Sequence, residues 1–501
     1  MPAHTIPFER FIQSYQEKLK NLFSDPSHQH YLQINRGIPP QMLRQILDEK
    51  PLSVFIPSEY QGRGANVTES LSVLEASGYQ SLAISLMVGI NGALFLQPLA
   101  NYGSETAKKH VFHQFMNNNA LGGLMITEPD YGSDALRMQT YFSESENGFE
   151  IKGTKHWAGL TSWADFWLIT ARRKTENGEL SRDIDFFIHD SKNPGLEVTE
   201  LFRNLGLMML PYGRNELNIS VPKIYRLQPE QTGLKMMLDI LHRSRIQFPG
   251  MGMGFLKRML DEALDHCKLR FVGGQSLFNY EQVKRRISEL QASFTICSAM
   301  CAYTAENAGM DKDLSKEDLQ ANSVKTVLTD LMQNAAQSLL QLVGAKGYSY
   351  DHIAGRAIVD SRPFQIFEGS NDILYQQISE AVVKGMRKMS IQNLYHYLKE
   401  HDLSHRAADY LKGSLNFDLD LKMAQDKLVQ LGQAIGRIMA LESVLKLGDK
   451  GFNPQLIENA IEFLKQEINT ILCTYQHNAQ LNVVEDYQMD SSWLGLVQAK
   501  S

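Results

Sequence analysis

Three short blocks contain side chains whose types and spacing could carry out chemistry. The first, Phe367-Glu368-Gly369-Ser370, offers a carboxylate beside a glycine. The second is 127–134, Thr-Glu-Pro-Asp-Tyr-Gly-Ser-Asp, and the third is 153–157, Gly-Thr-Lys-His-Trp. A carboxylate can accept a proton, a turn that contains glycine can approach a phosphate closely, and an indole can cover a planar ring. One block alone would mean little. All three together, in the order 127–134, 153–157 and 367–370 along the chain, form a specific pattern.

Composition and charge exclude several classes of protein. The chain has 501 residues, of which 43% are hydrophobic and 21% charged, which is typical of a globular protein of roughly three domains. Its net charge of -6 provides no basic surface for DNA or RNA, so we expect no nucleic-acid partner. Four cysteines are too few for a disulfide framework and indicate a reducing compartment, which predicts a cytoplasmic protein.

Metal ligands and membrane segments are not indicated either. The fourteen histidines show no zinc-ligand spacing, so we predict no metal site. Cys297 and Cys301, four apart on a predicted helix, are interpreted as buried small residues. Residues 76–104 carry no charge, but glycine, asparagine, glutamine and proline interrupt them, which favours buried helices over a transmembrane segment. The first 23 residues have helical spacing and no continuous apolar region, which predicts a folded helix rather than a signal peptide.

Hydrophobic periodicity divides the chain into four parts. Helical spacing predominates in 1–122, and a period of two with frequent turn signals predicts a β domain over 123–228. Helical spacing returns in 229–390, as in a helical bundle, and 391–501 carries two further amphipathic helices through 428–445 and 457–471. The glycines at 250, 252 and 254 lie inside a predicted helix, and we interpret them as helix-packing residues rather than a nucleotide loop. The predicted fold class is therefore α+β.

The three blocks resemble those of acyl-CoA dehydrogenases, which are FAD-dependent enzymes, over roughly residues 30 to 385. The resemblance implies an N-terminal α-helical domain, a central β-barrel or sandwich and a C-terminal four-helix bundle. The extra helices of 391–501 are similar to the extension of long-chain members. This segment has ten Lys and Arg against fourteen Asp and Glu, so it offers no polybasic lipid anchor. We expect it to pack within the chain or at a dimer interface.

The resemblance also implies a reaction. Glu368 would take the α-proton of a saturated acyl thioester while FAD accepts a hydride from the β-carbon, because no side chain can accept hydride. Burial of the carboxylate would raise its pKa and make it a stronger base. The product would be the trans-2-enoyl thioester of fatty acid β-oxidation, with CoA or acyl carrier protein as the carrier and an electron-transferring flavoprotein as the electron acceptor. The thioester oxygen would meet the backbone N–H of Glu368 and a flavin hydroxyl.

The remaining site residues are carried over from the same resemblance. Thr127 with Met125 and Ile126 would bond the isoalloxazine edge, Ser133 would reach the pyrophosphate near the CoA side, and Trp157 would pack against the flavin. The predicted cofactor-binding residues are Met125, Ile126, Thr127, Ser133, Trp157, Ala158, Gly159, Arg270, Gln341, Gly344 and Ser370. The predicted substrate-binding residues are Ser133, Arg245 and Gly369. Arg270 and residues 341–345 would contact the FAD of a neighbouring subunit, which implies a homodimer or homotetramer.

Two departures from the family pattern keep other functions open. Relatives have Ile or Leu and then Thr or Ser after the tryptophan, whereas this chain has Ala158 and Gly159, which changes the surroundings of the reactive flavin nitrogen. Ser244 stands before Arg245 in place of an acidic residue. The missing hydroxyl at Gly159 makes a flavin oxygenase or oxidase of the same fold an alternative, whereas the retained Glu368 favours the dehydrogenase. A second alternative is a non-catalytic scaffold that retains the fold.

Overall fold

The N-terminal part of the computed structural model is helical, and the structure describes residues 5–477, 482–487, 493 and 497. Its helices are α1 (Phe8–Ser24), α2 (Pro26–Ile34), α3 (Pro40–Asp48), α4 (Val67–Gln80), α5 (Leu82–Asn91), α6 (Gln97–Tyr102) and α7 (Glu105–Asn118). Asn66 caps α4 by accepting hydrogen bonds from two backbone N–H groups. The helical spacing predicted for the first residues is confirmed, because Phe11, Tyr15, Leu19 and Leu22 form the buried face of α1.

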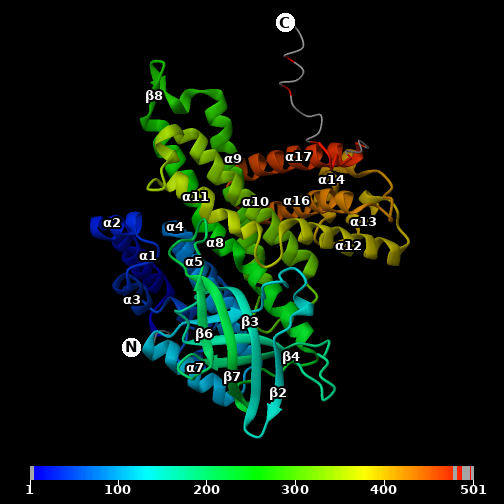
Figure 1. Cartoon of the computed structure of the whole chain (residues 1–501). Coiled ribbons are helices and arrows are strands. Elements are labelled where there is room, and N and C mark those ends of the chain that lie inside the picture. Colours follow the sequence, from blue (N-terminus) through cyan, green and yellow to red (C-terminus); the bar gives the residue numbers. More distant parts are fainter. Residues whose placement is uncertain (1–4, 478–481, 488–492, 494–496, 498–501) are drawn as a thin grey trace.

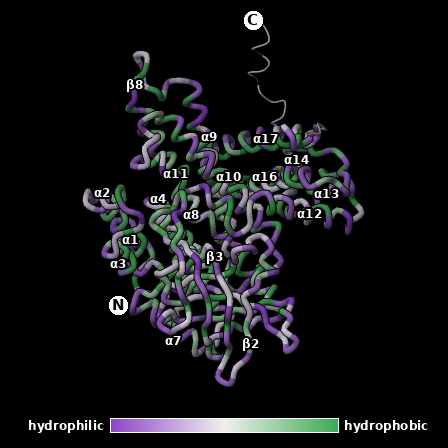
Figure 2. Tube along the Cα trace, in the orientation of Figure 1, coloured by the Kyte–Doolittle hydropathy of each residue, from purple (hydrophilic) through white to green (hydrophobic). Residues whose placement is uncertain are grey.

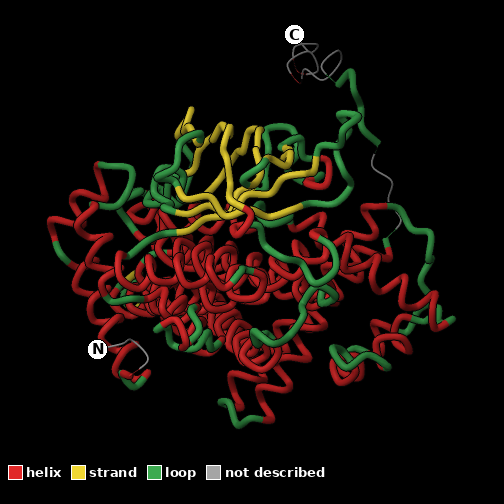
Figure 3. The backbone as a smooth tube through the Cα atoms, turned by 90° about the horizontal axis from the view of Figure 1, so that it is seen from below, coloured by secondary structure: helices red, strands yellow, loops and turns green. Residues whose placement is uncertain are grey.

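The central part is a sheet that curls over one side of the helices (Figure 3). Its strands are β1 (Gly122–Met125), β2 (Tyr141–Ser145), β3 (Gly148–Gly159), β4 (Phe166–Arg173), β5 (Asp185–Asp190), β6 (Leu196–Leu201) and β7 (Tyr212–Pro222). The strand order is β1-β4-β2-β3-β7-β6, and β5 also pairs with β4. Alternate residues of β7 are buried, as the period of two predicted. This curled sheet confirms the predicted β domain.

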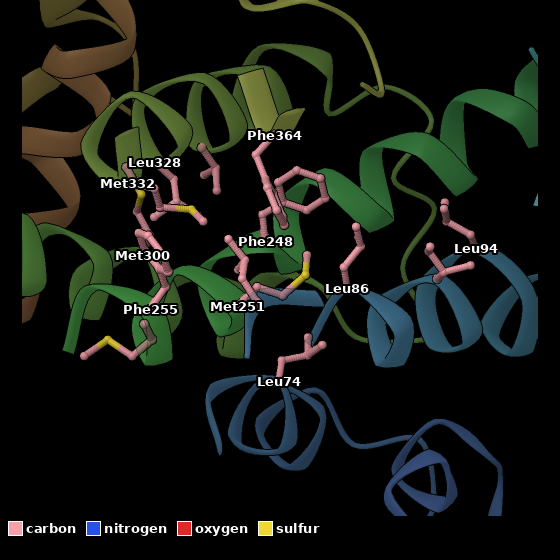
Figure 4. Close-up of a cluster of buried hydrophobic side chains, with 14 of the residues drawn as sticks. Leu74, Leu86, Leu94, Phe248, Met251, Phe255, Met300, Leu328, Met332 and Phe364 are labelled. Atoms are coloured by element: carbon pink, nitrogen blue, oxygen red, sulfur yellow. The ribbon is translucent and has the colours of Figure 1, made fainter. Parts of the chain in front are cut away.

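A helical bundle follows the sheet. Its long helices are α8 (Gly233–Leu269), α9 (Glu281–Asn307), α10 (Asp318–Val343) and α12 (Asn371–Met389). A small hairpin, β8 (Phe271–Val272) with β9 (Gln275–Ser276), separates α8 from α9, and α11 (Ile353–Ser361) with the short turn η9 (Arg362–Gln365) separates α10 from α12. The core of the bundle meets the N-terminal helices at Leu74, Phe248, Met251 and Leu328 (Figure 4). The segment between η9 and α12 carries Glu368.

The glycines of α8 allow this close contact with α4. A Cβ on Gly250 would lie 2.9 Å from Leu74 Cβ, and one on Gly254 would lie 2.0 Å from the backbone oxygen of Glu75. The two helices could not keep this separation with larger residues at these positions. The interpretation of the glycines as packing residues is therefore confirmed.

The C-terminal extension lies across the bundle (Figure 1). It comprises α13 (Leu394–Lys399), α14 (His405–Tyr410), α15 (Lys412–Leu415), α16 (Gln425–Asp449) and α17 (Pro454–Gln476). Helix α16 packs against α9, α10 and α12, and α17 packs against α9 and α16. Both long helices were predicted, and their apolar faces are buried within the chain.

The uncharged stretch near residue 90 is also buried. Leu82–Tyr102 is long and apolar enough to cross a membrane, but its most apolar window is completely buried inside the protein. Figure 2 shows hydrophobic residues spread over all parts of the chain rather than gathered in this one segment. The prediction of buried helices is confirmed.

Candidate active site

Glu368 lies on a short, tightly held loop at the start of α12. Its backbone φ of 54° is in the left-handed region, and Gly369 follows with a φ of 93°. Two consecutive residues in this region turn the chain sharply before Ser370, which is the N-cap of α12. A Cβ on Gly369 would lie 2.9 Å from a methyl carbon of Leu374. The glycine of the sequence block is therefore required by the turn that directs Glu368 into the protein.

The Glu368 carboxylate is buried and only partly satisfied. Oε1 accepts a hydrogen bond of 3.0 Å from the Ser244 hydroxyl, whereas the buried Oε2 accepts none from the part of the chain that the structure describes. Burial raises the pKa of this carboxyl, and the charges of Arg245 and Lys325 together with the Ser244 hydrogen bond oppose that rise. A buried oxygen without a donor, on an acid with a raised pKa, is suited to accept a proton.

Two basic side chains hold the loop through successive backbone carbonyl groups. Arg245 of α8 donates to the Glu368 carbonyl at 2.9 Å and to Asn322 Oδ1 at 2.8 Å. Lys325 of α10 donates to the Gly369 carbonyl at 2.8 Å, and burial lowers its pKa to about 7. The backbone N–H of Glu368 makes no hydrogen bond to any described residue. The loop is thus fixed through its carbonyl groups, while one N–H and one carboxylate oxygen stay available.

The ends of β1 and β3 lie side by side in the sheet. The His156 N–H donates to the Thr127 carbonyl at 2.8 Å, which joins the two sequence blocks. The pairing of β3 with β7 shifts register between Lys155 and Ala158, and Trp157 in this bulge has a φ of 55°. Its indole is 52% exposed. The bulge therefore turns the indole outward at the edge where the resemblance implies a flavin.

A buried ion pair fixes the loop after β1. Lys155 Nζ lies 3.0 Å from Glu128 Oε1 and donates to the Ile126 carbonyl at 3.1 Å. Glu128 in turn accepts from the backbone N–H groups of Gln139 and Thr140 at 2.5 and 2.9 Å. Burial lowers the pKa of Lys155 to about 8, although the Glu128 charge opposes this shift. This pair determines where the 127–134 block lies.

Tyr212 is a residue of the sheet that packs next to Gly159. It pairs with Gly159 across β3 and β7, and a Cβ on Gly159 would lie 3.3 Å from its ring and 2.8 Å from Ile90 Cδ1. Burial raises the pKa of the Tyr212 hydroxyl, and the Glu368 carboxylate raises it further, so the two groups are within electrostatic reach. The glycine at 159 thus provides the room that the Tyr212 ring and Ile90 occupy.

The other predicted residues fall into two groups. Met125 and Ala158 are buried beside Thr127 and Trp157, and Ser133 is exposed on the loop that follows. Arg270, Gln341 and Gly344 are exposed at the C-terminal ends of α8 and α10, whereas Arg245 and Lys325, earlier in the same helices, contact the Glu368 loop. The pKa of His266 at the end of α8 is lowered by burial and by His352, Arg270 and Lys346, which shows that positive groups gather there. The structure therefore brings together one part of the predicted site but not both parts within a single chain.

The sheet edge and the Glu368 loop fit the family's cofactor. The exposed indole offers a planar surface, and the Thr127 carbonyl bonds the residue before it. Glu368 Oε2 is buried and has no hydrogen-bond partner among the described residues. Within the described chain, no group of three or more His, Cys, Asp and Glu is arranged to hold a metal ion.

Three contributors to the site carry no signal in the sequence blocks. Lys325 precedes Glu368 by 43 positions, and Asn322 and Tyr212 lie still farther away in the sequence. Lys325 and Asn322 fall among apolar residues of a helix with ordinary periodicity. Only the packing of α10 against α8 reveals that they face the Glu368 loop.

Known proteins resemble this chain along most of its length. Family models described as the N-terminal, middle and C-terminal domains of acyl-CoA dehydrogenase match residues 13–119, 123–219 and 231–383. An acyl-CoA dehydrogenase of Bacillus subtilis is 24% identical over 69% of this chain and 90% of its own length. The mitochondrial very long-chain specific acyl-CoA dehydrogenase of Mus musculus is 22% identical over 74% of this chain and 58% of its own length.

The fold agrees as well. The crystal structure of an acyl-CoA dehydrogenase of Bacillus anthracis, complexed with FAD, superposes with a TM-score of 0.75 at 16% identity. The match covers 95% of this chain and 92% of the other, so the C-terminal extension shares the fold. From its domain models, its relatives and its fold, the chain belongs to the acyl-CoA dehydrogenase family of FAD-dependent oxidoreductases.

Proposed function

We propose that this protein oxidises a saturated acyl-CoA thioester to the trans-2-enoyl thioester, with Glu368 as the catalytic base. The observation that carries the proposal is the Glu368 carboxylate, which is buried, has a raised pKa and presents one unpartnered oxygen. A solvated loop acid would have none of these properties. Family membership supports the proposed type of reaction, and this geometry supports Glu368 as the base.

In this proposal, the residues around Glu368 have separate roles in the reaction. Bound FAD supplies the hydride acceptor. Glu368 Oε2 takes the α-proton, and Ser244 keeps Oε1 in place at 3.0 Å. The free backbone N–H of Glu368 is available to donate to the thioester oxygen, which would stabilise the negative charge that develops there. Arg245 and Lys325 hold the loop through its carbonyl groups, so that base and donor keep their relative positions.

The cofactor would be held by two separated sets of residues. Met125, Ile126, Thr127, Trp157, Ala158 and Gly159 form the flavin side in our proposal, with Ser133 at the pyrophosphate and Ser370 beside Glu368. Arg270 lies 25 residues after Arg245 on α8 and its continuation, which corresponds to about 38 Å along a helix. We infer that Arg270, Gln341 and Gly344 serve the FAD of a second subunit. The working assembly would then be a homodimer or homotetramer.

Substrate and electron acceptor follow from the family resemblance. We propose Ser133, Arg245 and Gly369 as substrate contacts, CoA as the carrier, an electron-transferring flavoprotein as the acceptor, and a cytoplasmic role in fatty acid β-oxidation. Gly159 supports one competing function, because this position lacks the hydroxyl that relatives place near the flavin. A flavin oxidase would pass the electrons to oxygen. The retained glutamate at 368 argues against an oxygenase, because oxygenating relatives commonly lack a base there.

Anaerobic titration with acyl-CoAs of increasing chain length distinguishes these functions. A dehydrogenase bleaches the bound FAD, forms trans-2-enoyl-CoA, and is reoxidised by an electron-transferring flavoprotein faster than by air. Rapid reoxidation by air with release of peroxide would identify an oxidase. Purified protein that neither contains nor takes up FAD would be a scaffold, and the proposed function would be wrong.

A further inference from the structure

A continuous path of polar contacts connects the C-terminal extension to the Glu368 loop. It begins at Arg437 of α16, which is only 7% exposed. The guanidinium contacts Asp330 Oδ2 of α10 at 3.4 Å and Glu467 Oε2 of α17 at 2.8 Å. It also lies 3.4 Å from the hydroxyl of Tyr375 of α12. One buried side chain of the extension therefore contacts α10, which carries Lys325, and α12, which begins directly after the Glu368 loop.

Asp330 accepts hydrogen bonds from residues at both ends of this loop. Its Oδ1 accepts from Gln365 Nε2 at 2.8 Å, just before the loop, and from Asn371 Nδ2 at 2.8 Å, just after it. Its Oδ2 accepts from the Tyr375 hydroxyl at 2.6 Å and pairs with Arg437. The carboxylate thus has separate oxygens for the loop and for the extension. Because a carboxylate is a rigid planar group, losing a contact at one oxygen lets the group rotate and alters the hydrogen bonds of the other oxygen.

The path then reaches the residue next to Glu368. Asn371 Oδ1 accepts from Lys325 Nζ at 2.9 Å, and the same ammonium donates to the Gly369 carbonyl at 2.8 Å. Lys325 and Asn371 are both buried. In such surroundings a broken contact is not replaced by water, so each group depends on the geometry of the next.

We propose that Arg437 is a positioning residue, and that the C-terminal extension braces the Glu368 loop through Asp330, Asn371 and Lys325. This inference rests on the proposed function only in calling Glu368 the base, because the contacts themselves belong to the folded chain. It gives the extension a role within its own subunit. Without Arg437, the partly buried carboxylate of Asp330 would lack its cation, and the loop contacts on its other oxygen would weaken.

Hydrogen–deuterium exchange of the loop tests this proposal without any reaction. Arg437→Gln should accelerate amide exchange in residues 366–371 by about tenfold or more, because the loop opens locally more often. Lys450→Gln is the matched control. Lys450 also joins α16 to the bundle, through an ion pair with Glu306 of α9, but it has no contact with the path. Its removal should leave exchange in 366–371 unchanged.

Flavin reduction provides the second readout. In Arg437→Gln the rate of FAD reduction by acyl-CoA should fall by about tenfold to a hundredfold, with little change in KM, because the base is displaced while the substrate contacts remain. Arg437→Lys should recover part of the rate, since it keeps a cation beside Asp330. Asp330→Asn, which preserves the size of the side chain, should reproduce both effects and serves as the test if Arg437→Gln does not fold.

The outcomes separate the bracing role from the proposed function. If Arg437→Gln accelerates exchange in the loop, but no acyl-CoA reduces the FAD bound to the wild-type protein, the bracing role is supported and the proposed function is wrong. If loop exchange, rate and KM match the wild type while only the melting temperature drops, Arg437 is merely structural and the inference is overturned.

Discussion

At the residue scale, burial and the neighbouring side chains have opposite effects on the pKa of the Glu368 carboxyl. Burial raises the pKa of Glu368, while Arg245, Ser244 and Lys325 moderate that rise. The charge of the same carboxylate also raises the pKa of Tyr212 on β7, in addition to the effect of burial. A base must be deprotonated before it reacts and must hold the proton afterwards, and a pKa moved towards neutrality satisfies both demands. We therefore propose that the environment of Glu368, and not the carboxylate alone, suits it to act as a base.

Lys325→Met should shift the pH dependence of FAD reduction. The rate rises as pH passes upward through the pKa of Glu368, because only the ionised form accepts a proton. Removing a neighbouring positive charge raises that pKa further, so the acidic limb should move up by about one pH unit. Loss of the hydrogen bond to Gly369 should also lower the plateau. Stopped-flow absorbance across the pH range measures both.

The control for this shift is Lys257→Met, which removes an ammonium from an ion pair with Asp261 elsewhere on α8. Its profile should match the wild type. An unmoved acidic limb in Lys325→Met would show that Lys325 does not influence the base.

The sequence alone predicts Glu368 as the base, but it does not predict the residues that surround it. Its block is recognisable because the left-handed turn requires Gly369 immediately after it. Lys325, Asn322 and Tyr212 come from other elements, and nothing local distinguishes them from residues that simply pack. Contacts between residues far apart in sequence depend on tertiary packing, which hydrophobic periodicity does not specify.

At the scale of elements, a buried pair positions the flavin side. Lys155 and Glu128 connect β3 to the loop after β1, and both side chains are almost completely buried. Lys155→Met should leave the Glu128 carboxylate buried without its partner and cost about 3–5 kcal/mol of unfolding free energy. The loop that carries Thr127 and Ser133 should loosen, so affinity for FAD should fall. Urea denaturation and FAD titration measure the two effects.

An exposed pair in the same sheet offers a comparison. Arg173→Gln removes the ion pair with Glu144, whose side chains are 57% and 55% exposed. Its loss should cost less than about 1 kcal/mol and leave FAD affinity unchanged. Equal losses in the two variants would refute a special role for the buried pair.

Long elements were predicted well, and short ones were not. The helices α8, α10, α16 and α17 span several turns, so their apolar spacing repeats often enough to be recognised. The extension also contains α13, α14 and α15, with six, six and four residues, which periodicity did not reveal. Segments of one or two turns are stabilised mainly by the surfaces on which they pack.

At the scale of the whole molecule, the two parts of the predicted cofactor site lie on separate elements. One part is at the ends of β1 and β3 in the sheet, and the other adjoins β8, which lies well away from the sheet (Figure 1). If Arg270 serves a second subunit, complementation should occur. A hybrid of Glu368→Gln and Arg270→Gln subunits contains one site with an intact Glu368 and an intact Arg270. At limiting FAD it should recover activity that neither parent variant shows.

Coexpression with two different tags and sequential purification would yield this hybrid. If the hybrid stays as inactive as both parents, although it binds FAD at saturating concentration, the site is not shared between subunits. Light scattering on the wild type gives the number of subunits in the same preparation.

The most direct test of the whole account is the reduction of bound FAD in Glu368→Gln. The substitution keeps the size of the side chain and removes its basicity, so FAD should bind as in the wild type. Reduction by acyl-CoA should slow at least a hundredfold, to about the extent that loss of a general base predicts. Glu306→Gln, an exposed change on α9, should react normally. Undiminished bleaching of the flavin in Glu368→Gln would contradict the assignment of Glu368 as the base.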